Sequence, residues 1–162
     1  MNFFERAKEM EEQTRNYYLE LADKCAANEG LKYILKKLVM DHEQHGKKFQ
    51  QMSDDECTDL NSTEAFESTI EFFRNLQHKH ETFSCDIDQM KMYQQALELL
   101  EKKIEFYIQG KSEVECEINQ AVLTEIIDEE NHHKFVLKNI IEIVSRPQTW
   151  IENAEFTHIE SY

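Results

Sequence analysis

The chain has 162 residues with 33 acidic and 18 basic side chains, so its formal net charge is −15. Hydrophobic residues make up 40 % of it, which predicts one folded domain and excludes a chain that is disordered by composition. Only three glycines and one proline are present, whereas a β-sandwich or barrel needs turn residues every ten or so positions. The composition therefore indicates an all-α fold.

The negative charge also limits the partners and the location that we expect. No stripe of Lys and Arg is available to release counterions from a phosphate backbone, so neither nucleic acid nor an anionic membrane surface is an expected partner. No apolar run approaches the roughly 20 residues that span a bilayer, and the first residues lack the features of a secretion signal. We therefore expect a cytoplasmic protein. Its four cysteines form no C-x-x-C pair, so neither a zinc ribbon nor a rubredoxin-type iron site is expected. Because disulfides are rare in the cytosol, we expect these cysteines to be reduced thiols.

Apolar positions recur at helical spacing in four long stretches. These are approximately residues 4–25, 31–52, 86–109 and 112–145. Gly110 is expected to stop the third helix, because glycine is the usual residue just after a helix end. Ser112 and Glu115 have the S-x-x-E spacing of a capping box, which predicts that the fourth helix begins there.

A long connection separates the second and third stretches. Residues 62–76 within it repeat apolar positions at helical spacing, which predicts a short helix inside a crossover. Pro147 follows the fourth stretch, and the segment after it keeps enough large apolar residues to pack back on the helices. The expected organisation is a four-helix bundle over residues 1–146 and a C-terminal tail over residues 147–162.

The two halves of the chain resemble each other. Residues 7–18 are similar to residues 96–107 at an offset of 89 (96 − 7), and each segment ends in a tyrosine. His45 and His133 correspond at an offset of 88 (133 − 45). Two similar helical hairpins joined by a long crossover have the connectivity of a ferritin-like four-helix bundle.

Two polar side chains fall on the apolar face of the fourth stretch. Glu130 and His133 are one helical turn apart and share that face with Leu137. A carboxylate buried among apolar side chains costs several kcal/mol unless it is paired, and Glu-x-x-His can hold one metal ion. The spacing therefore predicts a metal site. Glu129 and His132 have the same spacing, but their face is polar and is expected to be solvated.

Two more polar side chains are expected to face the same core. Glu11 falls on the face that carries Ala7 and Tyr18, and His45 falls on the face that carries Phe49. A single inward histidine is more often a hydrogen-bonded core residue than a ligand. Convergence from three helices favours a metal site.

These residues resemble the rubrerythrin-like branch of the ferritin-like superfamily, from about Phe4 to Val144. Bundles of that family supply one Glu from each of the first and third helices and Glu-x-x-His from each of the second and fourth. The segments that carry the resemblance are Ala7 to Tyr18, Asp41-His42-Glu43-Gln44-His45, Ala96 to Tyr107 and Ile126 to His133. The resemblance implies that Glu11, His45, Glu130 and His133 are metal ligands and that Tyr18 and Tyr107 lie near the site.

Two positions depart from the family pattern. His42 stands in place of the second-helix Glu, and Leu100 stands in place of the third-helix Glu. The internal repeat marks the same two positions, because it pairs His42 with Glu130 and Leu100 with Glu11. Only two firm carboxylates remain, which neutralise one divalent ion and not two. With His42 included, the expected ligand set is Glu11, His42, His45, Glu130 and His133. This set suits iron, zinc or another first-row ion.

Alternatives remain open for the site and for its function. Glu98 or Glu101 would replace the missing third-helix ligand if a π-bulge rotated the helix face, so one or two iron ions are considered. The resemblance implies redox or peroxide chemistry if the metal is iron, with electrons from a separate donor protein. A homodimer is also expected. The other interpretation is a non-catalytic bundle whose metal site has degenerated and whose role is structural or in interactions.

Overall fold

The computed structural model describes residues 2–24, 29–54 and 87–145. Its four long helices are α1 (Phe3–Lys24), α2 (Glu29–Ser53), α4 (Ile87–Gly110) and α5 (Glu117–Ser145), and a short 3₁₀ turn, Lys111–Glu113, follows α4. The described residues contain no β-strand, so the all-α prediction is confirmed. Within these ranges no helix combines the length and the hydropathy that are needed to cross a membrane.

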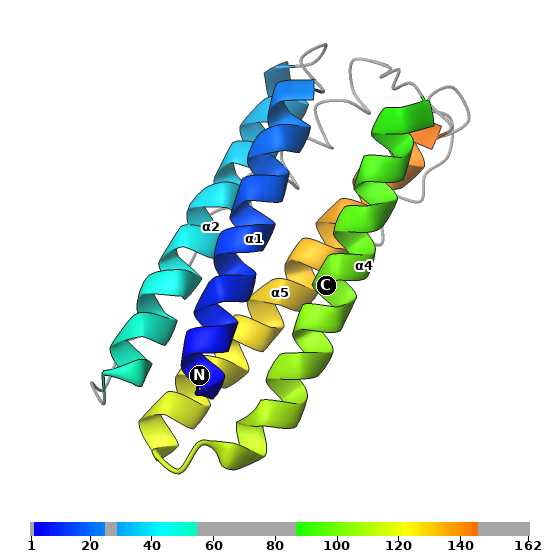
Figure 1. Cartoon of the computed structure of the whole chain (residues 1–162). Helices are drawn as coiled ribbons and strands as arrows, with labels where there is room; N and C mark the ends of the chain where they lie inside the picture. Colours follow the sequence, from blue (N-terminus) through cyan, green and yellow to red (C-terminus); the bar gives the residue numbers. More distant parts are fainter. Residues whose placement is uncertain (1, 25–28, 55–86, 146–162) are drawn as a thin grey trace.

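The helices form two antiparallel hairpins (Figure 1). Helices α1 and α2 lie side by side, as do α4 and α5, and α4 begins at the end of the bundle opposite to the end of α2. Helices α2 and α4 therefore run in the same direction, which is the ferritin-like arrangement that the sequence predicted. The short helix expected at residues 62–76 and the tail at 147–162 lie outside the described residues. So do the domain boundary at 146 and three of the cysteines.

A reciprocal pair of hydrogen bonds fixes the start of α1. The backbone N–H of Glu5 donates to Asn2 Oδ1 at 2.8 Å, and the backbone N–H of Asn2 donates to Glu5 Oε2 at 2.8 Å. This capping box satisfies amides that have no partner inside the helix. It sets the register that turns Ala7, Glu11 and Tyr18 toward the core.

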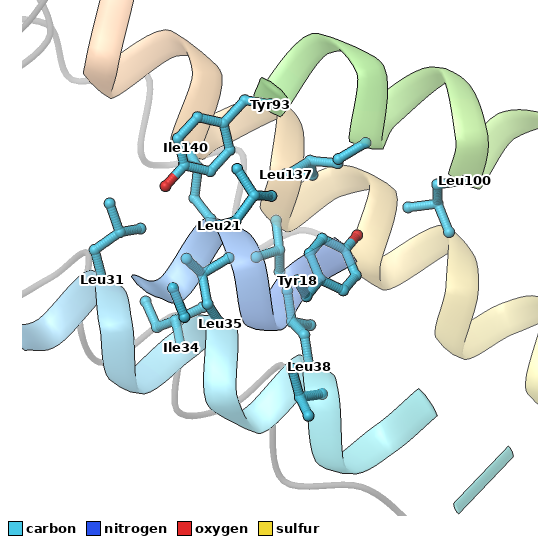
Figure 2. Packing of buried hydrophobic residues seen from close by; sticks show 14 of the residues in the cluster. Tyr18, Leu21, Leu31, Ile34, Leu35, Leu38, Tyr93, Leu100, Leu137 and Ile140 are labelled. Atoms are coloured by element: carbon cyan, nitrogen blue, oxygen red, sulfur yellow. The ribbon is translucent and has the colours of Figure 1, made fainter. Parts of the chain in front are cut away.

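Two apolar clusters fill the bundle, one toward each end. The larger cluster, shown in Figure 2, includes Tyr18, Leu21, Leu35, Leu38, Leu100, Leu137 and Ile140. The smaller cluster includes Ala7, Phe49, Met52, Tyr107, Leu123 and Ile126. On each helix the inward positions between the two clusters carry polar side chains. The core therefore consists of two apolar regions with one polar layer between them.

The beginning of α5 differs from the prediction. The helix starts at Glu117, and Ser112 does not cap it, because the Ser112 hydroxyl donates to the carbonyl of Gln109 at 3.1 Å. Val114 has an extended backbone, with φ −87° and ψ 112°, and its side chain is buried in the smaller cluster. Burial of Val114 outweighs the local capping preference, so the chain turns before it re-enters a helix.

Gly110 also differs from the expected helix stop. Its φ of −72° and ψ of −18° are helical, so α4 continues through it into the 3₁₀ turn. The requirement for glycine comes from packing instead, because a Cβ atom at this position would overlap the ring of Phe3. Phe3 packs against Phe106 with ring centroids 5.1 Å apart, which joins the start of α1 to the end of α4.

Replacement of Gly110 by alanine is therefore expected to destabilise the bundle. Gly110→Ala should lower the free energy of unfolding by about 1 kcal/mol or more, because the methyl group displaces the Phe3 ring. Gly46→Ala is the matched control, since a Cβ there meets nothing closer than Glu11 Cβ at 3.8 Å. It should raise stability by about 0.5–1 kcal/mol through helix propensity. Urea unfolding measures both changes, and the same sign for the two variants would contradict this packing argument.

Candidate metal centre

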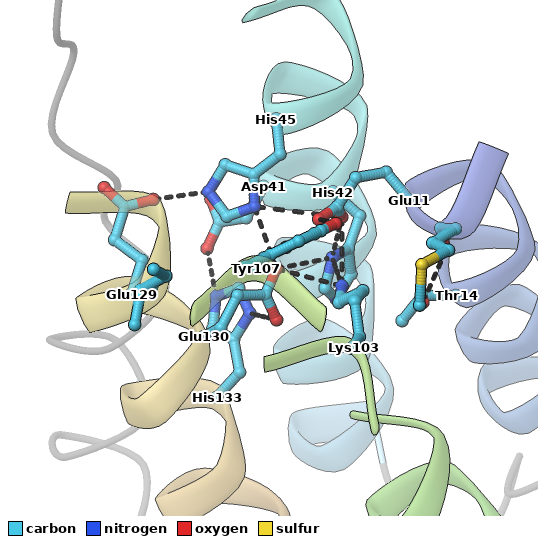
Figure 3. Close-up of polar contacts among 12 residues, drawn as sticks. Glu11, Thr14, Asp41, His42, His45, Lys103, Tyr107, Glu129, Glu130 and His133 are labelled. Carbon is cyan, nitrogen blue, oxygen red and sulfur yellow. Dashed lines mark hydrogen bonds and ion pairs between the residues drawn. The ribbon is translucent and has the colours of Figure 1, made fainter. Parts of the chain in front are cut away.

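All four helices contribute ionisable side chains to the polar layer (Figure 3). We call this set the ionisable layer; its members are Glu11, Asp41, His42, His45, Lys103, Glu130 and His133. Each of them is at most 5 % exposed. Charges that are buried to this extent are tolerated only when opposite charges or hydrogen bonds compensate them. The contacts within the layer therefore decide what the site can do.

Glu11 has partners at both carboxylate oxygens. The Tyr107 hydroxyl donates to Glu11 Oε1 at 2.5 Å, while Oε2 lies 2.7 Å from His42 Nδ1 and 3.1 Å from Lys103 Nζ. Burial alone would raise the pKa of Glu11, but the Lys103 charge and the His42 hydrogen bond outweigh burial and lower this pKa to about 2. Glu11 is therefore an ionised carboxylate at neutral pH.

Lys103 lies between the two central carboxylates. Its ammonium donates to Glu130 Oε1 at 2.9 Å and to Glu11 Oε2 at 3.1 Å, and the side chain has no exposure to solvent. Burial would raise the pKa of Glu130 as well, but the charges of Lys103 and His42 hold this pKa well below its usual range. A protein cation thus occupies the space between these two carboxylates.

Lys103 was not predicted from the sequence, although its position on the helix carries a signal. Lys103 follows Tyr93, Ala96 and Leu100 at helical spacing and precedes Tyr107, so it falls on the apolar face of α4. Leu100 itself is buried in the larger apolar cluster and supplies no ligand, as expected. A lysine on an inward face requires a buried partner of opposite charge.

His42 shares its Nδ1 atom between two neighbours. Nδ1 lies 2.7 Å from Glu11 Oε2 and 3.2 Å from Lys103 Nζ. One nitrogen cannot donate to a carboxylate and also accept from an ammonium, so the shorter distance assigns a proton on Nδ1 that is donated to Glu11. The ring stacks on Tyr18, with centroids 5.1 Å apart.

His45 lies between two carboxylates of α5. Its Nδ1 is 3.0 Å from Glu130 Oε1, and its Nε2 is 2.5 Å from Glu129 Oε2. Burial would lower the pKa of His45, but the surrounding carboxylates of Glu11, Glu129 and Glu130 raise it well above its usual range. The expectation that Glu129 is solvated was therefore wrong, because Glu129 reaches back over the edge of the core to His45. Its side chain is only 16 % exposed.

His133 is held by Asp41, a second residue that the sequence analysis did not assign. His133 Nε2 lies 2.9 Å from Asp41 Oδ2, and His133 Nδ1 lies 3.6 Å from Glu130 Oε2. Burial would lower the pKa of His133, but the two carboxylates outweigh burial and raise it to about 9. Asp41 therefore fixes the orientation of this ring.

Three buried polar atoms of the layer accept or donate no hydrogen bond among the described residues. They are His42 Nε2, Glu130 Oε2 and His133 Nδ1. Buried polar atoms without partners are rare, and each needs a physical explanation. Imidazole nitrogens and a carboxylate oxygen are the donor atoms that first-row metal ions prefer.

The structure brings the residues predicted for the site together. Glu11, His42, His45 and Glu130 each offer one ligand atom, and these atoms lie within 4.8 Å of one another. His133 adjoins this group through its 3.6 Å approach to Glu130.

The two acidic residues considered as replacements do not join this group. Glu98 and Glu101 are exposed, and the side chain of Glu101 pairs with Lys134 at 3.2 Å on the outside of the bundle. Helix α4 is α-helical throughout, so no π-bulge turns either of them inward. The alternative of a rescued third-helix ligand was therefore wrong.

A surface pocket reaches the layer between α1 and α2. Its volume is about 290 Å³, and its lining includes His42 and Gly46. Charged side chains of both signs surround the opening, namely Lys8, Glu12, Arg15, Glu43 and Lys47. A small solute can therefore approach the His42 side of the layer from the surface.

The Rubrerythrin family model matches residues 2–141. The chain belongs to the rubrerythrin family. No curated protein and no solved structure matches it significantly. Rubrerythrins typically bind iron, and the buried nitrogen and oxygen donors of this chain are suited to a first-row ion. Its Lys103 and His42 mark the departure from a site that is built only from Glu and Glu-x-x-His.

The raised pKa of His133 predicts that the stability of the metal-free protein depends on pH. A histidine whose pKa rises on folding from 6.5 to about 9 stabilises the fold fully below pH 6.5, and this contribution is lost as the pH rises through 9. Asp41→Asn should lower this pKa by about 1 unit or more, because it removes the facing charge. NMR titration of the His133 ring measures the shift.

Glu129→Gln serves as the control for that titration. Glu129 contacts His45 and makes no hydrogen bond to His133. The pKa of His133 should therefore stay close to 9 in Glu129→Gln. An unchanged His133 titration in Asp41→Asn would contradict the assigned role of Asp41.

Proposed function

We propose that the protein binds a single divalent first-row metal ion at the Glu130 and His133 side of the ionisable layer. The observation that carries the proposal is the pair of Glu130 Oε2 and His133 Nδ1, which face each other at 3.6 Å without a hydrogen bond to any described residue. First-row ions bind carboxylate oxygen and imidazole nitrogen at about 2.0–2.2 Å, so one ion can contact both atoms. His42 and His45 would complete the ligand set.

Asp41 supports this assignment. A histidine that binds a metal through one nitrogen commonly donates the N–H of the other to a carboxylate, which fixes the ring and its tautomer. The Asp41 carboxylate stands 2.9 Å from His133 Nε2, so the remaining nitrogen, Nδ1, is the one that faces Glu130.

The charges of the layer favour one ion. Glu11 and Glu130 supply two negative charges, and Lys103 already balances one of them through hydrogen bonds of 2.9 and 3.1 Å. Asp41 and Glu129 add negative charge next to His133 and His45. One divalent ion is compatible with this balance, whereas a second would have to lie beside the buried Lys103 ammonium and would be repelled by it.

The finer proposal is that the ion is iron and that the substrate class is peroxide or oxygen. Iron supplies one-electron redox chemistry. Reduction of hydrogen peroxide to two water molecules consumes two electrons and two protons, so a single ferrous ion requires a further electron from a separate donor protein. The pocket beside His42 gives a small oxidant a path to the layer. Tyr18 and Tyr107 cover the layer on its apolar sides and limit entry of water.

A second candidate function is a metal-independent structural bundle. The observation that favours it is that Lys103 and the protonated His45 balance Glu11 and Glu130 without any metal ion. In that case the protein acts through its surface and not through the ionisable layer.

Metal analysis distinguishes the two candidates. After anaerobic loading with Fe(II), and separately with Zn(II), the purified protein should hold about one ion per chain by mass spectrometry of the element. Glu130→Gln and His133→Gln should each lower metal affinity by about tenfold or more, since both remove a ligand. His132→Gln is the matched control, because His132 is the sequence neighbour of His133 and is not one of the buried side chains of the ionisable layer. A wild-type protein without bound metal would support the structural candidate.

Peroxide chemistry has its own test. The reduced, iron-loaded protein is expected to be oxidised by hydrogen peroxide in a stopped-flow absorbance experiment, and a chemical reductant should restore the starting spectrum. Glu130→Gln should abolish the absorbance change at equal protein concentration. Persistence of the same change in Glu130→Gln would show that the iron reacts elsewhere.

A further inference from the structure

The Lys103 ammonium has the position and the contacts of a cation at the centre of the site. It is fully buried, it donates to carboxylates from two other helices at 2.9 and 3.1 Å, and it also lies 3.2 Å from His42 Nδ1. The carboxylates come from α1 and α5 while Lys103 comes from α4, so the ammonium links three helices (Figure 3).

Lys103 uses only part of Glu130. The ammonium engages Oε1, whereas Oε2 faces His133 Nδ1 at 3.6 Å. One carboxylate therefore has a lysine on one oxygen and an open coordination direction on the other. Glu11 is more fully engaged, because Tyr107 donates to one of its oxygens and His42 and Lys103 contact the other.

A metal ion cannot share the Glu11 side of the layer with this ammonium. The ion would repel the positive charge of Lys103 and would compete with it for Glu11 Oε2 and Glu130 Oε1. Moving Lys103 aside would leave its ammonium buried without acceptors, because apolar clusters lie on both sides of the layer. The Glu11 side is thus closed to a metal, while the Glu130 and His133 side stays open.

We propose that the Lys103 ammonium permanently occupies one of two cation positions in the centre, so that the chain binds one metal ion fewer than the centre would hold without it. The count of one ion in the wild type rests on the function proposed above. The difference in the number of bound ions between chains with and without Lys103 does not rest on it. Lys103 is then a specificity-determining residue that sets the number of metal ions. It also lets the bundle fold around Glu11 and Glu130 before any metal arrives.

The first test compares the metal content of Lys103→Glu with that of the wild type after loading with Fe(II) or Zn(II). Lys103→Glu replaces the resident cation with a carboxylate and should gain about one ion per chain. Lys102→Glu is the matched control, because Lys102 is the exposed neighbour on α4, and its metal content should equal that of the wild type. A folded Lys103→Glu protein that gains no ion overturns the proposal, as does a wild-type protein that holds two ions.

The absolute and relative counts separate the two proposals. A wild type with no ion and a Lys103→Glu variant with one would refute the proposed function but support the role of Lys103. If the wild type and Lys103→Glu each hold one ion, the result would support the proposed function and would refute the role of Lys103.

The second test does not depend on metal. Lys103→Met keeps the length of the side chain and removes the charge, so in EDTA it should lower the melting temperature by about 10 °C, which is the scale expected for breaking a buried ion pair. Glu11→Gln in the Lys103→Met background should recover part of that loss, because it removes a carboxylate that has lost its cation. Lys102→Met should change the melting temperature little. An unchanged melting temperature in Lys103→Met would overturn the proposal even if Lys103→Glu fails to fold.

Discussion

Two carboxylates are buried in the middle of the bundle, and the rest of the structure has to compensate their negative charges. Glu11 and Glu130 have no exposure to solvent, and neither can remain ionised without a cation close by. Lys103 supplies that cation from a third helix, and the histidines of α2 supply hydrogen bonds. Because the four helices each contribute to this compensation, their relative positions are coupled through it. The layer is therefore paired through its own side chains.

The apolar clusters on either side give the layer its strength. They exclude water, so hydrogen bonds and ion pairs inside act in a medium of low dielectric constant. The local contacts at the helix ends keep the layer in register. The capping box of Asn2 and Glu5 sets the rotation of α1, and the close approach of Phe3 to Gly110 holds the start of α1 against the end of α4.

Helical periodicity was sufficient to predict four helices and the inward direction of Glu11, His45, Glu130 and His133, because each of these depends on spacing along one helix. The internal repeat and the long crossover predicted how the helices pair. The remaining features depend on contacts between helices. Lys103 was not predicted to be part of the site because its role depends on carboxylate partners on α1 and α5, which its own helix does not reveal. The start of α5 was misplaced because the burial of Val114 is a tertiary effect, whereas the S-x-x-E spacing is local. Glu129 was assigned to solvent by its helix face, yet a long side chain at the edge of that face reaches His45.

The carboxylates of Glu11 and Glu130 differ in how many hydrogen bonds restrain them. Glu11 is restrained at one oxygen by Tyr107 and at the other by His42 and Lys103, so its carboxylate cannot rotate without breaking several contacts at once. Glu130 is restrained at one oxygen only, and its second oxygen can turn about the first. The Glu11 carboxylate on α1 is therefore held in one position. The Glu130 carboxylate on α5 is the side chain of the site that can change its orientation. In the proposed metal centre, Glu130 is therefore the ligand whose second oxygen can change position.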